Sequence, residues 1–66
     1  MKGLTQEEFD WLRRIEPEVD KSWDELTGFE QKFIEDVLER FRRWGTRLIL
    51  SAKQWEIITR ISEKIV

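Results

Sequence analysis

Apolar residues recur every three or four positions along two long stretches of this chain, residues 28–44 and 52–65. That spacing places them on one face of an α-helix, so both stretches are predicted to be amphipathic helices. In each, the apolar positions cover about half of the helix circumference or more, whereas packing one neighbour needs a stripe about 100° wide. They are Phe29, Phe33, Ile34, Val37, Leu38, Phe41 and Trp44 in the first stretch, and Ala52, Trp55, Ile57, Ile58, Ile61 and Ile65 in the second, with Val66 directly after it.

A shorter amphipathic helix is predicted over residues 6–15, where the apolar positions are Phe9, Trp11, Leu12 and Ile15. The two longer helices are similar in length, so they can pack antiparallel as a hairpin, with the short helix across the groove between them. The predicted fold is therefore a small all-α three-helix bundle that forms one domain over residues 1–66.

Helix boundaries are predicted by capping residues. Pro17 disfavours helical backbone at the residue before it, so the first helix is expected to end near Ile15. Gly45 suits the left-handed position that ends the middle helix. One helical turn is predicted around residues 22–26, and a short extended link over residues 46–50. Four capping boxes, each a Ser or Thr followed three residues later by Glu or Gln, are Thr5…Glu8, Ser22…Glu25, Thr27…Glu30 and Ser51…Gln54.

The composition argues against several classes of function. The chain contains no cysteine and no histidine, which removes disulfides, thiolate or imidazole metal ligands and the usual groups of nucleophilic and acid–base catalysis. No Gly-rich phosphate loop is present. We therefore expect a protein that is not an enzyme and uses no cofactor or metal. With no long apolar run and no signal-peptide pattern, we also expect it to be cytoplasmic and not bound to a membrane.

Charge is distributed unevenly along the chain. Residues 1–39 contain 12 acidic and 5 basic residues, whereas residues 40–66 contain 2 acidic and 7 basic residues. A basic segment interleaved with aromatic residues can bind nucleic acid through phosphates and stacking, and Arg40, Arg42, Arg43, Arg47 and Lys53 would serve it here.

A structural interpretation of these charges is favoured. Arginines near a helix C-terminus complement its dipole, and Asp36 can pair with Arg40, and Glu39 with Arg43, at four-residue spacing. Phe41 and Trp44 fall within the apolar face and are expected in the core. Nucleic-acid binding is therefore kept as an alternative.

More apolar side chains are present than three packed helices can cover. Trp44 and Trp55 are expected to be core residues, but the three residues 48–50 cannot all point inward, and Ile57 lies at the edge of its helix face. Exposed apolar patches often mark interfaces, and Trp and Arg are enriched among residues that dominate binding. The expected contacts to a protein partner, either another protein or a second copy, are Trp11, Trp23, Arg47, Ile49 and Ile57.

Residues 26–65 resemble a helical hairpin found in short phage and prophage proteins. The likeness lies in residues 26–30, in Phe33, Ile34 and Val37, and in residues 50–55, which read Leu-Ser-Ala-Lys-Gln-Trp and are followed by Ile58 and Ile61. The resemblance implies a mobile-element origin and, with it, binding and inhibition of a host protein; it implies no catalytic residue. The leading hypothesis is a non-enzymatic interaction protein of this kind. The alternatives are a small nucleic-acid-binding regulator and a structural homo-oligomer.

Overall fold

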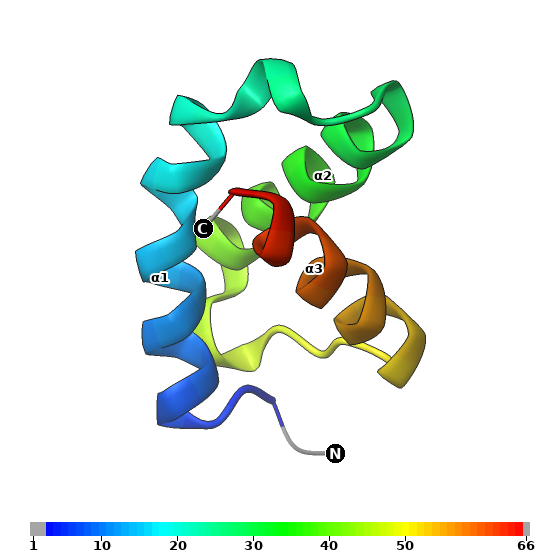
Figure 1. Ribbon diagram of the computed structural model, residues 1–66. Coiled ribbons are helices and arrows are strands. Elements are labelled where there is room, and N and C mark those ends of the chain that lie inside the picture. Colours follow the sequence, from blue (N-terminus) through cyan, green and yellow to red (C-terminus); the bar gives the residue numbers. More distant parts are fainter. Residues whose placement is uncertain (1–2, 66) are drawn as a thin grey trace.

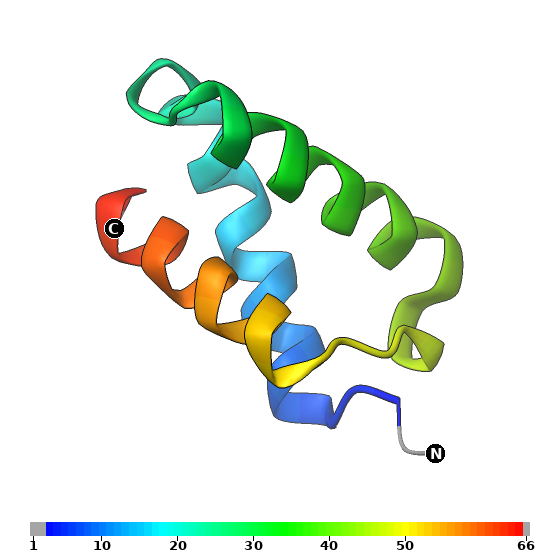
Figure 2. The same ribbon diagram turned by 90° about the vertical axis from the view of Figure 1, so that its right-hand side faces the viewer.

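The computed structural model describes residues 3–65 and contains three α-helices in that range: α1 (Gln6–Lys21), α2 (Gly28–Trp44) and α3 (Ala52–Ile65). Two single turns of 3-10 helix, η1 (Trp23–Glu25) and η2 (Gly45–Arg47), join them. In Figure 2, α2 and α3 run in opposite directions and α1 crosses behind both. Figure 1 shows the same packing from the side, with α1 along one edge. The predicted all-α three-helix bundle is confirmed.

Local capping explains where all three α-helices begin. The Thr5, Thr27 and Ser51 hydroxyls each accept a hydrogen bond from the backbone N–H three residues on, at 3.1 to 3.2 Å. In return, the Glu8, Glu30 and Gln54 side chains accept from the N–H of the cap residue at 2.8 to 2.9 Å. These three predicted capping boxes are therefore confirmed, and with them the boundaries of α2 and α3.

The fourth capping box is wrong. Ser22 makes no side-chain cap hydrogen bond, and it is instead the residue that ends α1, with its N–H donating to the Glu18 carbonyl at 3.0 Å. The helical turn expected around residues 22–26 does form, as η1, but it follows directly from α1.

The predicted end of the first helix is also wrong, because α1 continues through Pro17 to Lys21. A proline inside a helix removes one hydrogen bond and costs about 3 kcal/mol. The continuation places Val19, which is 1% exposed, in the core, and burying a side chain of this kind contributes about 1.5–3 kcal/mol. Burial on both sides of Pro17, at Ile15 and Val19, thus offsets the local preference.

The core consists of two clusters, and all three helices contribute to both. The first joins Leu12, Ile15, Val37, Phe41, Leu48 and Ile58. The second joins Val19, Leu26, Ile34, Leu38, Ile61 and Ile65.

Among the residues that the structure describes, no helix is long and apolar enough to cross a membrane.

Among residues 3–65, two ion pairs connect different helices. Glu16 on α1 pairs with Arg42 on α2, whose Nε donates to Glu16 Oε2 at 2.6 Å. Glu30 at the start of α2 pairs with Lys64 at the end of α3, with Lys64 Nζ 2.7 Å from Glu30 Oε1. The hydrogen bond from Lys64, followed by that from the Thr27 backbone N–H, lowers the pKa of Glu30 below its ordinary value.

Candidate interaction surface

The turn after α2 determines which side chains reach the surface at that end of the molecule. Gly45 has φ of 58°, a backbone conformation that glycine adopts far more readily than other residues, and this ends the helix. After η2 the chain becomes extended at Leu48, which is only 5% exposed and belongs to the first core cluster. Successive side chains of an extended segment point to opposite sides. Burial of Leu48 therefore directs Ile49 outward, where it is 53% exposed.

Trp44 lies beside Ile49 on the same face. Phe41, one turn earlier, is 5% exposed and fills the first core cluster, whereas Trp44 is 49% exposed. Trp44 and Ile49 line a shallow depression together with Arg40, Arg47 and Leu48. We call Arg40, Trp44, Arg47 and Ile49 the Trp44 surface.

The charge of the Trp44 surface is positive. Arg40 lies 3.3 Å from Asp36 in an ion pair whose side chains are both more than half exposed, which is a weak contact in water. Arg47 forms no ion pair with any residue between positions 3 and 65. Tryptophan and arginine are enriched among the residues that dominate binding at protein interfaces, and the Trp44 surface contains both.

Of the five residues predicted to contact a partner, only Arg47 and Ile49 come together here. Trp11 lies on α1, where its ring packs against that of Trp55 on α3, with centroids 6.1 Å apart. Trp23 and Ile57 are partly buried and pack against the second core cluster, so the expectation that Ile57 is spare apolar surface is wrong. The spare surface lies instead at the end of α2.

Periodicity assigned both Trp44 and Phe29 to the core, and both predictions are wrong because the two side chains are exposed. Phe29 is 65% exposed and stacks on Phe33 with centroids 6.1 Å apart. Both residues lie in a terminal turn of α2, where the neighbouring helices no longer cover the full apolar face. Proximity of Trp44 to the helix-ending Gly45 was the available signal.

The five basic residues proposed for nucleic-acid binding do not act alike. Arg40 forms the predicted pair with Asp36, but Arg42 turns to Glu16 on α1, a partner that spacing along one helix could not indicate. The predicted pair of Glu39 with Arg43 is not formed. Within the described part of the chain, Arg43, Arg47 and Lys53 have no ion-pair partner.

No group of three or more carboxylates in the described range is arranged to hold a metal ion. Comparison of the chain with protein-family models, curated proteins and solved structures found no match.

Proposed function

We propose that this chain is a non-enzymatic interaction protein that binds another protein through the Trp44 surface. One observation carries the proposal. Two of the three large apolar side chains that are most exposed in the described residues, Trp44 and Ile49, lie together around one depression. A 66-residue domain has little stability to spare, and exposed apolar surface of this kind commonly marks an interface.

The chemistry of the Trp44 surface indicates the kind of partner. Arg40 and Arg47 flank the apolar centre, so the complementary surface has an apolar hollow for the indole and carboxylates at its edge. The resemblance of residues 26–65 to short phage and prophage proteins makes a host protein the first partner to test. Occupying a surface of that protein would modulate or inhibit it.

The test compares binding of two alanine variants that each remove an exposed aromatic side chain. A partner captured from the host is purified, and its Kd for the wild-type chain, Trp44→Ala and Phe29→Ala is measured by calorimetry. Loss of a residue that dominates an interface costs about 2 kcal/mol or more, so Trp44→Ala is expected to weaken binding about 30-fold. Phe29→Ala, at the other end of α2, should leave Kd within about 2-fold. Equal effects of the two substitutions would contradict the assignment.

Single-stranded nucleic acid is the second candidate, because an exposed tryptophan beside two arginines is also a stacking platform. Fluorescence anisotropy of a labelled DNA or RNA strand separates the two functions. Nucleic-acid binding would weaken steeply between about 50 and 200 mM salt. An absence of binding at the lower salt concentration eliminates this candidate.

Self-association is tested separately by sedimentation of the wild-type chain and Ile49→Glu. A homodimer formed through the Trp44 surface would dissociate when a carboxylate replaces Ile49. A monomer in both samples eliminates the structural homo-oligomer.

A further inference from the structure

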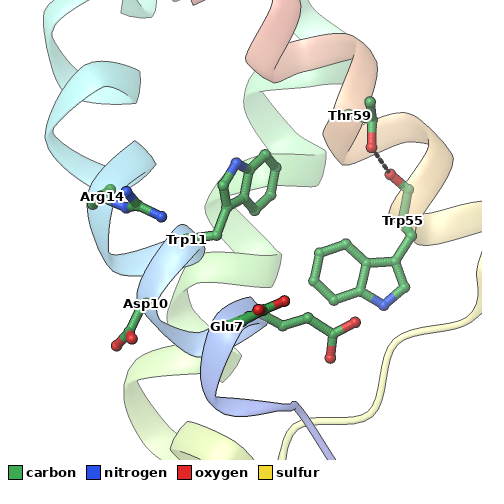
Figure 3. Close-up of a pocket in the computed structure, with 7 residues that line it drawn as sticks. Glu7, Asp10, Trp11, Arg14, Trp55 and Thr59 are labelled. Carbon is green, nitrogen blue, oxygen red and sulfur yellow. Dashed lines mark hydrogen bonds between the residues drawn. The ribbon is translucent and has the colours of Figure 1, made fainter.

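A second site with opposite charge lies between α1 and α3. An open cleft of about 500 Å³ is lined by Glu7, Glu8, Asp10, Trp11, Arg14, Trp55 and Thr59. Figure 3 shows its two tryptophans, Trp11 from α1 and Trp55 from α3, facing the same opening. Volumes of several hundred Å³ are typical of sites that take small groups.

The tryptophans form a fixed aromatic floor. Their ring centroids are 6.1 Å apart with planes inclined by 49°, and both rings are partly buried against the first core cluster. The Thr59 hydroxyl donates to the Trp55 carbonyl at 2.8 Å, so it is already engaged. A centroid separation of 6.1 Å leaves no room for a group between the two rings, so a ligand would lie over their exposed faces.

The three carboxylates of this cleft differ in the hydrogen bonds that they accept. Glu8 Oε1 accepts from the Thr5 N–H at 2.9 Å, which holds its charge at the start of α1. Asp10 accepts from the Gln6 amide at 3.1 Å, and its side chain points away from the tryptophans in Figure 3. Glu7 makes no hydrogen bond or ion pair among residues 3–65, so its carboxylate is available at the edge of the cleft.

Arg14 is the one cation in the lining; it lies two turns of α1 beyond Glu7, and its side chain points toward Trp11 in Figure 3. Arg14 is seven positions after Glu7, which is a distance of about 10 Å along α1. The cleft therefore has an acidic end at Glu7 and Glu8, an indole floor and a basic end. Indole faces attract cations, and the alkyl stems of Arg and Lys pack well on apolar surface.

We propose that this cleft binds an arginine or lysine side chain of a basic polypeptide segment. The alkyl stem lies on Trp11 and Trp55, and the cationic head meets Glu7 and Glu8. This site is separate from the Trp44 surface. Its acidic end favours basic segments, whereas the arginines of the Trp44 surface favour acidic ones.

The four indole N–H signals in a nitrogen–proton correlation spectrum provide the test. The full chain is titrated with the acetylated, amidated tetrapeptide Gly-Arg-Lys-Gly, and with Gly-Gln-Gln-Gly and Gly-Glu-Glu-Gly as controls. The basic peptide should shift the Trp11 and Trp55 signals while those of Trp23 and Trp44 stay in place, and the control peptides should shift none. Absent shifts, or equal shifts of all four signals, overturn the proposal.

Two variants that remove the same charge sharpen the result. Glu7→Gln should raise the Kd of the basic peptide about 2- to 5-fold, the effect of one exposed charge pair. Glu63→Gln, on an exposed part of α3 away from the cleft, should leave it unchanged, as should Trp44→Ala. Equal effects of Glu7→Gln and Glu63→Gln would show that the peptide binds by general charge attraction, and this would overturn the proposal. Failure of the Trp44 surface to bind a protein has no bearing on this outcome.

Discussion

Gly3 lies where the N-terminal segment crosses η2, and no space remains there for a side chain. A Cβ on Gly3 would overlap the carbonyl oxygen of Thr46. The next residue, Leu4, donates its N–H to that same oxygen at 2.8 Å and packs against the first core cluster. One small residue thus permits the segment before α1 to join the turn that carries the Trp44 surface.

Replacing two of the glycines with alanine should therefore change stability in opposite directions. Gly3→Ala is expected to lower the free energy of unfolding by about 1–3 kcal/mol, because the added methyl group breaks the contact with Thr46. Gly28→Ala, whose added Cβ meets nothing within 4 Å, should raise it by up to about 1 kcal/mol by stiffening the first turn of α2. Thermal unfolding followed by circular dichroism measures both changes. A Gly3→Ala chain as stable as the wild type would contradict the close approach.

At the scale of elements, α1 shows how burial prevails over a local signal. The ring of Pro17 leaves the Arg13 carbonyl without its helical donor. Arg13 and Pro17 are both exposed, so water can satisfy that carbonyl. The second half of α1 carries Val19 into the second core cluster, and Glu16 reaches Arg42 on α2. A helix ending at Ile15 would lose both contacts.

Pro17→Ala is accordingly expected to stabilise the protein. The substitution restores one backbone hydrogen bond and removes an unfavourable residue from a helix interior, for a gain of about 1–3 kcal/mol. For a domain of this size each kcal/mol raises Tm by about 4–8 °C. The measurement is Tm by differential scanning calorimetry. A lower Tm for Pro17→Ala would show that the helix does not pass through this position.

At the scale of the whole molecule, the Glu30–Lys64 pair connects the beginning of α2 with the end of α3. The lowered pKa of Glu30 means that folding favours its ionised form, first through the hydrogen bond from Lys64. The resulting stabilisation is fully present above the ordinary value of 4.5 and disappears as the pH falls through the lowered pKa. Acid should therefore weaken the connection between these two helices.

Glu30→Gln isolates this charge, since glutamine can still complete the capping box with Thr27. At pH 7 the variant should be less stable than the wild type by about 1 kcal/mol or less, the range of partly exposed pairs. At acid pH the difference should shrink, because the wild-type carboxylate takes up a proton as the pH falls through its lowered pKa. Urea unfolding at the two pH values measures it, with Glu63→Gln as the control. A difference of the same size at both pH values would rule out the charge as its source.

The fold also places the acidic and basic halves of the sequence on two different surfaces. Acidic residues of the first half form one end of the α1–α3 cleft, and basic residues of the second half flank Trp44. The fold thus presents two aromatic surfaces of opposite charge.

The number of helices and most of their boundaries followed from the sequence alone. Periodicity and capping depend on residues within one or two turns of the same helix. The helix boundaries at Thr27, Gly45 and Ser51 could therefore be predicted without knowing which other helices lie nearby. Tertiary structure decided the path of α1 through Pro17, the exposure of Phe29 and Trp44 and the pairing of Arg42 with Glu16. Each of these depends on where a distant helix begins or stops covering an apolar face, and no local pattern contains that information. The Trp44 surface belongs to this second group, because it exists only where the cover provided by the other helices ends.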